Sequence, residues 1–289
     1  MTRQVTYFEI SKIKEFNMPT TQDALDSLTN PEFDDWLHIV NISGGKDSAA
    51  LAVLMRTKYP EIHARAEYVF CDTQCELEET YEYLETLEDY LGKPIQKLNA
   101  LSLFNIRPKP GREPFDIILK EKYSGFLPSP RSRWCTRDLK IAPFEEFVGQ
   151  RQAFSYIGIR ADEKRDGYVA KKPPSLSNKQ NIVPIYPFKD NNYGITDIKG
   201  LLDDNGVGLP SYYEWRSRSG CYFCFYQQIG EWQRLKKNHP DLFEKAKEYE
   251  APSDGFTWCE GRTLDEIAAL PEQPLPVIDD SQGCAICHL

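Results

Sequence analysis

The hexapeptide Ser43–Ser48 constrains the fold of this chain more than any other stretch. Its sequence, Ser-Gly-Gly-Lys-Asp-Ser, lies between two apolar runs. The run before it, 37–42, is short and rich in β-branched residues, which predicts a buried strand of a parallel sheet. The run after it, 49–55, is rich in Ala and Leu without a helix breaker, which predicts a helix. The hexapeptide is therefore expected to form a tight loop between a strand and a helix.

The residue types of this loop suit a polyphosphate. The candidate nucleotide-binding residues are Ser43, Gly44, Gly45, Lys46, Asp47 and Ser48. Two glycines let the backbone approach an anion, and the helix that follows presents N–H groups at the positive end of its dipole. Lys46 adds a positive charge and the serines add hydroxyl donors. Asp47 cannot bind phosphate directly, so we expect it to orient the loop or a Mg²⁺-bound water.

Bulk properties narrow the class of protein. The 289 residues are enough for one α/β domain with a smaller appendage. A net charge of −9 argues against binding DNA over the whole surface, so a nucleic-acid contact must be local or arranged by a partner. Without a long apolar run or an apolar leader, we expect no membrane span and a cytoplasmic protein. Its eight cysteines then favour metal, iron–sulfur or redox roles over disulfides.

Two more strand ends are expected to face the crevice beside the loop, because ligands of open α/β sheets bind beyond the carboxyl ends of strands. A strand predicted over 64–70 leads to Asp72 and Thr73, which are candidate nucleotide contacts. A simple turn at the strand end is the alternative for this pair.

A further strand is predicted over 153–157, and it leads to Gly158 and Arg160. Both are candidate nucleotide-binding residues, since Arg160 can pair with a phosphate in bidentate fashion. A surface ion pair of Arg160 with Asp162 or Glu163 is the alternative. Further along, an amphipathic helix is predicted over 231–249.

Residues 105–142 form a basic segment in an acidic chain. They include nine Lys or Arg and four Asp or Glu, a local net charge of +5. A basic loop near a phosphate site is a candidate contact for DNA, and a surface loop balanced by neighbouring acids is the alternative. Within it, Cys135 is expected to open a helix. There the helix dipole, Arg133 and Arg137 would lower the pKa of its thiol.

The chain carries two Cys-x-x-Cys pairs, Cys221 with Cys224 and Cys284 with Cys287. This spacing brings two sulfurs to one side of a turn, as in zinc and iron–sulfur sites. One pair supplies half a site, so Cys135 and Cys259 are further candidate ligands. Buried cysteines without a metal are the alternative.

Ser-Gly-Gly-x-Asp-Ser resembles the signature of the PP-loop ATP pyrophosphatases. The resemblance implies an α/β fold of the Rossmann-like adenine nucleotide α-hydrolase kind, with a parallel sheet, followed here by a small Cys-rich subdomain. It also implies binding of ATP with Mg²⁺, attack on the α-phosphate and release of pyrophosphate. The expected parts are an N-terminal extension (1–30), a nucleotide-binding domain (31–210) and a helical Cys-rich subdomain (211–289).

The cysteine motifs resemble one branch of that superfamily. Cys-Thr-x-x-Leu-Lys-x-x-Pro, from Cys135, looks like the sulfonucleotide-reductase-like members, and Arg-Ser-Gly-Cys-x-x-Cys, from Arg218, is similar to DNA-phosphorothioation and phage members. The resemblance implies a 4Fe-4S cluster, with Zn²⁺ as the alternative. The implied ligands are Cys135, Cys221, Cys224 and Cys284, with Cys259 or Cys287 as rivals for the fourth position.

The leading interpretation is an ATP pyrophosphatase that activates an acceptor for sulfur insertion, in DNA phosphorothioation of the Dnd or Ssp kind. The catalytic candidates are Lys46, Asp47, Arg160 and Cys287, the last as a sulfur carrier. DNA and a cysteine desulfurase or other sulfur donor are the expected partners, and a homo-oligomer is compatible with the sequence. The alternatives are a phosphoadenylyl- or adenylyl-sulfate reductase, a tRNA thiolation enzyme, and a non-catalytic nucleotide-binding zinc scaffold.

Overall fold

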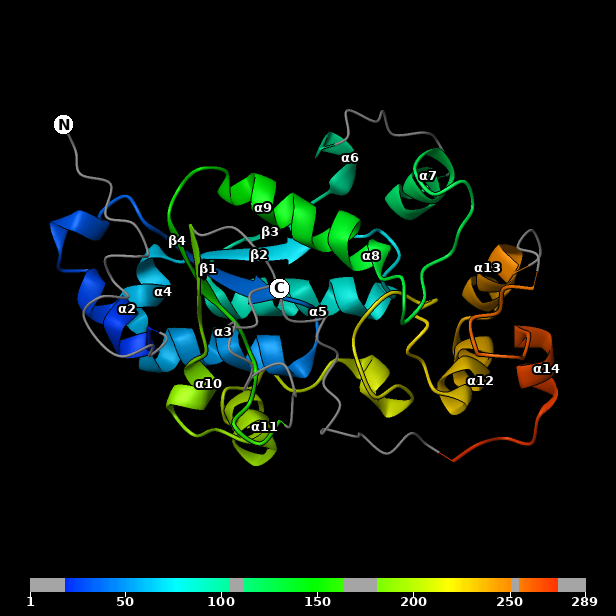
Figure 1. Ribbon diagram of the computed structural model, residues 1–289. Coiled ribbons are helices and arrows are strands. Elements are labelled where there is room, and N and C mark those ends of the chain that lie inside the picture. The colour runs from blue at the N-terminus through cyan, green and yellow to red at the C-terminus, as the bar shows by residue number, and fades with distance from the viewer. Residues whose placement is uncertain (1–18, 104–111, 164–180, 251–254, 275–289) are drawn as a thin grey trace.

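The computed structural model describes residues 19–103, 112–163, 181–250 and 255–274 (Figure 1). Five parallel strands form one sheet in the order β3-β2-β1-β4-β5. The strands are β1 (Leu37–Ile42), β2 (Glu67–Cys71), β3 (Ile95–Leu98), β4 (Ala153–Tyr156) and β5 (Ile182–Ile185). The chain builds from β1 outward to β3 and then continues at β4 on the other side of β1. The predicted α/β class with a parallel sheet is confirmed.

The strand β1 has the predicted bounds, whereas β2 starts later than predicted. Residues 60–65 form the short helix α4 (Pro60–Arg65), so the strand predicted from residue 64 begins at Glu67. In the central register, Val40 of β1 lies opposite Tyr68 of β2 and Tyr156 of β4. This register brings the carboxyl ends of β1, β2 and β4 to the same edge of the sheet.

Helices cover both faces of the sheet (Figure 1). One face packs on α3 (Lys46–Lys58), α5 (Glu78–Leu91) and α11 (Ile195–Asp204), through alternate strand residues such as Val40 and Phe154. The other face packs Ile39 and Val69 on α9 (Ala142–Val148). Because side chains alternate along a strand, each strand contributes to both layers, which explains why the strands are apolar throughout.

The structure has eight further helices in the described ranges, in addition to those that cover the sheet and α4. They are α2 (Thr21–Ser27), α6 (Ala100–Leu103), α7 (Pro114–Glu121), α8 (Trp134–Thr136), α10 (Pro187–Asp190), α12 (Ile229–Asn238), α13 (Pro240–Glu250) and α14 (Leu264–Ala269), with 3₁₀ turns at Pro31–Phe33 and Ser211–Glu214 and a π-helical turn at Arg137–Ile141. None of the helices in the described ranges is long and apolar enough to cross a membrane.

The prediction of one helix over 231–249 is wrong. Helix α12 ends at Asn238, and a second helix, α13, begins at Pro240. Proline has no N–H for an interior helix hydrogen bond but is well suited to the first position of a helix. Five residues of this stretch were expected to face inward, and the structure buries Trp232, Leu235, Phe243 and Ala246 completely and Leu242 in part.

A second core lies beside the carboxyl edge of the sheet, where Figure 1 shows α12 to α14. It joins Phe115 of α7 and Trp134 of α8 to aromatic residues of the C-terminal part, including Phe223, Trp232 and Trp258. The basic segment and the C-terminal part thus share one core. The predicted domain boundary at residue 211 stays a prediction.

Candidate functional site

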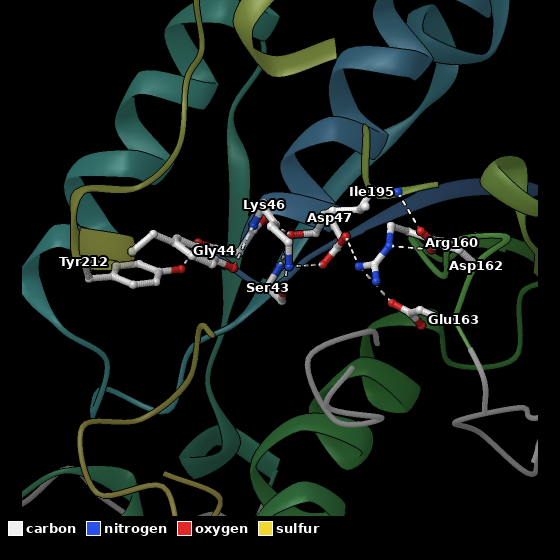
Figure 2. Close-up of polar contacts among 12 residues, drawn as sticks. Ser43, Gly44, Lys46, Asp47, Arg160, Asp162, Glu163, Ile195 and Tyr212 are labelled. Carbon is white, nitrogen blue, oxygen red and sulfur yellow. Dashed lines mark hydrogen bonds and ion pairs between the residues drawn. The ribbon is translucent and has the colours of Figure 1, made fainter. Parts of the chain in front are cut away.

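The loop Ser43–Ser48 connects β1 to α3 and is closed by its own hydroxyl groups. The Ser48 hydroxyl accepts the Ser43 N–H at 3.0 Å and donates to the Gly45 carbonyl at 3.0 Å. From the C-terminal part, the Tyr212 hydroxyl donates to the Gly44 carbonyl at 2.7 Å. Figure 2 shows Tyr212 pointing at the loop from one side. These hydrogen bonds define the shape of the loop.

Both glycines of the loop are required by close packing. Gly44 has a φ of 73°, and a Cβ there would lie 2.5 Å from Cγ2 of Thr80. A Cβ on Gly45 would lie 2.7 Å from Oγ of Ser219. The helix α3 starts directly afterwards, and no side chain caps it at Gly45. The positive end of this 13-residue helix therefore faces the loop, as in phosphate-binding sites.

Asp47 lies between two cations at the start of α3. Its carboxylate is 3.2 Å from Nζ of Lys46 and 2.7 Å from Nη1 of Arg160. Arg160 follows β4, the strand beside β1, and also contacts Asp162 at 2.9 Å and Glu163 at 3.3 Å. Burial disfavours the charged guanidinium, but the carboxylates of Asp47 and Glu163 outweigh burial and raise its pKa. The ion pairs join the two strand ends that flank the reversal in strand order (Figure 2).

The buried position of Arg160 bears on its predicted role. Ion pairs with Asp162 and Glu163 are present, but Arg160 is buried, so they are not the surface pair of the alternative. Asp47 is an additional partner that the sequence did not suggest. Asp162 also accepts the Ile195 N–H at 2.8 Å. Near this cluster, a Cβ on Gly158 would lie 3.0 Å from the Asp47 carbonyl oxygen. Direct contacts of Gly158 and Arg160 with a nucleotide stay predictions.

Asp72 and Thr73, which follow β2, contact different parts of the structure. The Asp72 carboxylate accepts the Gln74 N–H and the Tyr81 hydroxyl, both at 2.8 Å, so the alternative of a local turn is present. The Thr73 hydroxyl donates to Glu76 at 3.0 Å and lies 3.2 Å from the sulfur of Cys221. Thr73 thus connects the sheet edge to the cysteine region, and nucleotide contacts of this pair stay predictions.

Three of the four predicted metal-ligating cysteines line one cavity of about 40 Å³. They are Cys135 from α8, and Cys221 and Cys224 from the turn that the Cys224 N–H closes on the Cys221 carbonyl at 3.0 Å. Their thiols suit a sulfur-ligated group. Within the described ranges, however, no three His, Cys, Asp or Glu side chains are arranged to hold a single metal ion. Cys284 and Cys287 lie outside the described residues.

The predicted lowering of the Cys135 pKa is wrong. Burial raises the pKa of this thiol and outweighs the opposing effects of Lys140 and Arg133. Arg137 turns instead to Asp138, at 3.1 Å. Burial likewise raises the pKa of Cys221, and the nearby Glu76 carboxylate adds to the rise. The cavity therefore favours neutral thiols, which would lose their protons on metal binding.

Ser219 places the cysteine cavity beside the loop Ser43–Ser48. It lines the cavity together with Gly220, and it is the residue that a side chain on Gly45 would strike. The neighbouring Tyr213 hydroxyl accepts the Lys46 N–H at 3.3 Å. The segment that carries Cys221 and Cys224 thus packs directly on the candidate nucleotide site.

The part of the chain that contains the loop and the cysteine pair matches a known protein family. The model of the phosphoadenosine phosphosulfate reductase domain matches residues 38–236, which include both the loop and the Cys221–Cys224 pair. The chain belongs to this family. An uncharacterised protein of Methanocaldococcus jannaschii is 26% identical to this reductase-domain chain over 213 residues, 72% of this chain and 40% of that protein. The match spans between 40% and 50% of the length of this relative and of two other curated relatives.

Two solved structures are similar to this reductase-domain chain at 14% sequence identity. One is the phosphoadenylyl-sulfate reductase of Candida auris in a phosphate complex, with a TM-score of 0.41, covering 68% of this chain and 93% of that one. The other is the U34-tRNA thiolase NcsA of Methanococcus maripaludis with its [4Fe-4S] cluster. Its TM-score is 0.39, and the match covers 84% of this chain and 82% of the thiolase.

Arg216, which holds the turn of Cys221 in place, was not identified from the sequence. Its buried guanidinium donates to the carbonyls of Gly220 at 2.9 Å and of Cys221 at 2.8 Å. It therefore holds the turn that presents Cys221. The signal was an arginine five residues before the first cysteine of the pair, without an acidic residue between them. The rival ligand Cys259 packs in the second core, where burial raises the pKa of its thiol to about 11.

Proposed function

We propose that this protein is an ATP pyrophosphatase that activates an acceptor oxygen by adenylylation for replacement by sulfur, in DNA phosphorothioate modification. The observation that carries the proposal is the packing of Ser219 on Gly45, because it brings a polyphosphate loop beside a cavity with three thiols. An enzyme that couples phosphate activation to sulfur transfer needs both chemistries within reach of one acceptor.

In the proposed reaction, an acceptor oxygen attacks the α-phosphorus of ATP, and the bond to the β-phosphate breaks with release of pyrophosphate. Lys46, the start of α3 and Mg²⁺ stabilise the negative charge that builds at the α-phosphate. Asp47 keeps Lys46 and Arg160 in place. The sulfur comes from a cysteine desulfurase or another donor as a persulfide, with Cys287 as the proposed carrier. The outer persulfide sulfur attacks the activated phosphorus, and AMP leaves with the adenylylated oxygen. A thiol reductant then cleaves the remaining S–S bond, which frees the phosphorothioate and regenerates the Cys287 thiol.

A metal group fits the donor set of the cavity. Cys135, Cys221 and Cys224 would hold a 4Fe-4S cluster, or zinc as the alternative, with Cys284 as the fourth ligand. When bound, a cluster would supply iron sites that handle sulfur. The chain's own part is to present three thiols from two segments and to enclose them with Thr73, Leu139 and Phe223.

The test is release of pyrophosphate from ATP by the full-length protein, purified without oxygen, in the presence of DNA and a sulfur donor. We expect K46Q to lower the rate at least 100-fold, about the effect of removing one stabilising group from a developing charge. R151Q, which changes an exposed arginine near the amino end of β4, should keep the rate. If no acceptor supports pyrophosphate release, the proposal is wrong.

The family match favours a second candidate, a sulfonucleotide reductase. Such an enzyme needs no ATP and releases sulfite from adenylyl or phosphoadenylyl sulfate when thioredoxin or glutathione supplies electrons. Sulfite release without ATP would select this function. Pyrophosphate release with tRNA in place of DNA would select tRNA thiolation, and ATP binding without turnover would select the zinc scaffold.

A further inference from the structure

We propose that Arg133, Tyr226 and Arg218 form a docking site for the phosphodiester backbone of a polynucleotide, beside the cysteine cavity. The proposal rests on the proposed function, because it locates the polynucleotide acceptor of that reaction. It concerns residues that the nucleotide loop and the cysteine cavity do not use.

The geometry is that of two guanidinium groups ordered by one aromatic ring. The guanidinium of Arg133 lies 5.9 Å from the centre of the Tyr226 ring, and that of Arg218 lies 5.7 Å from it. Both distances are within the range of a cation–π contact. All three side chains are partly exposed. The ring therefore orders two long, partly exposed cationic side chains at one place on the surface.

The cluster lies next to the thiols because the same chain segments supply both. Arg133 and Arg218 precede cavity cysteines by two and three residues, and Tyr226 follows a cavity cysteine by two. Phe225 lines the cavity and packs on Tyr226 with ring centres 4.5 Å apart. Figure 1 shows α8, which follows Arg133, beside the yellow segment that carries Arg218 and Tyr226. An anion held here would lie beside the cavity wall.

The surrounding charge favours a polyanion over a single small anion. Exposed Arg131 lies two residues before Arg133, and the Arg137 side chain, 64% exposed, lies one helical turn after it. Asp138, the acidic residue of this turn, is buried and pairs with both Lys122 at 2.8 Å and Arg137 at 3.1 Å, so the three groups together keep a net positive charge. In a chain of net charge −9, such a local basic stretch attracts a polyanion that the acidic surface as a whole repels. Guanidinium groups bind successive phosphates in bidentate fashion.

The test measures binding of a fluorescein-labelled DNA oligonucleotide to the full-length protein by anisotropy, without ATP. We expect R133Q/R218Q to raise the Kd at least tenfold and to reduce the slope of log K against log salt concentration by about two, one for each lost phosphate contact. The matched control is R151Q, because Arg151 also lies over an aromatic ring, Phe147, at 5.6 Å, but away from the cavity. Equal effects of R151Q and R133Q/R218Q would overturn the proposal.

Tyr226 provides a second test that keeps both charges. We expect Y226F to bind DNA like the unchanged protein, because the ring remains, and Y226L to bind several-fold more weakly. Far-ultraviolet circular dichroism checks that each variant is folded. An effect of Y226F equal to that of Y226L would contradict the ordering role of the ring.

Competition separates the sources of phosphate. Unlabelled DNA should displace the labelled DNA at far lower phosphate concentration than AMP or phosphoadenylyl sulfate does. Displacement by these mononucleotides at equal phosphate concentration would overturn the proposal. If RNA competes better than DNA, the docking site stands and the DNA part of the proposed function fails. Since the assay needs no turnover, loss of pyrophosphate release alone leaves this result unaffected.

Discussion

At Arg160, three carboxylates surround one guanidinium that is almost completely removed from water. The side chain is 1% exposed, and that of Glu163 is fully buried. Charges in such a place are stable only together, because each alone would lose its hydration without compensation. Arg160 therefore joins the loops after β1 and β4 whether or not it also contacts a phosphate.

Replacing this arginine should destabilise the fold. We expect R160Q to lower the free energy of unfolding by about 3 kcal/mol, because Asp47 and Glu163 would each lose a buried ion pair, while Asp47 would keep Lys46 at 3.2 Å. R160K should cost less, since it keeps the charge but loses the planar fork. Urea unfolding at neutral pH measures both. K199Q, at an exposed position of α11, should change stability by no more than about 0.5 kcal/mol. An R160Q variant as stable as the unchanged protein would show that the ion pairs contribute nothing.

At the scale of elements, the loop before α3 is shaped as much by the C-terminal part as by its own sequence. Tyr212, Tyr213 and Ser219 each contact it, from a stretch that also leads to the Cys221–Cys224 turn. The loop Ser43–Ser48 and the segment that leads to the cysteine turn are therefore joined by direct contacts.

This contact can be tested by a paired substitution. We expect G45A to weaken ATP binding at least tenfold, because the new methyl group would lie 2.7 Å from Oγ of Ser219 and displace the loop. The double variant G45A/S219G should recover most of the affinity, since the space is restored. Isothermal titration calorimetry with ATP and Mg²⁺ measures each. G200A is the control, because a Cβ there meets no atom within 4 Å. A double variant that binds as weakly as G45A would exclude this contact as the cause.

At the scale of the molecule, two cores meet at the carboxyl edge of the sheet. The sheet core carries the nucleotide loop, and the second core carries the cysteines on segments almost 90 residues apart in sequence, Cys135 and the Cys221–Cys224 turn. The cavity exists only because both segments pack into the same core.

The amount of bound metal tests whether these two cysteine segments form one site. We expect C135S and C224S each to reduce bound metal to less than half, because each removes one of a small set of thiolate ligands. C259S should keep it, since Cys259 packs in the second core apart from the cavity lining. Elemental analysis and the absorbance spectrum of protein purified without oxygen measure the result. About four irons with sulfide would indicate a cubane cluster, and one zinc a structural site. Unchanged metal in both C135S and C224S would remove these cysteines from the ligand set.

The sequence predicted the parts whose conformation depends on near neighbours. The bounds of β1 and the position of the loop after it follow from a short apolar run and two glycines. The two errors in helices concern residues whose preferences compete. Ala64 and Arg65 suit either the end of a helix or the start of a strand. Pro240 marks a helix start that hydrophobic periodicity across residues 231–249 conceals.

The sequence by itself determined the unit of β1, the loop Ser43–Ser48 and α3, and also the turn of the cysteine pair. Backbone conformation and hydrogen bonds within a few residues are enough to form each of these local structures. Only the tertiary structure decided what surrounds them. Asp47 meets Arg160 across 113 positions, Thr73 meets Cys221 across 148, and Gly44 meets Tyr212 across 168. Burial also reversed the expected direction of the Cys135 pKa. Pairing and desolvation depend on which distant segments pack together, and no local pattern specifies that.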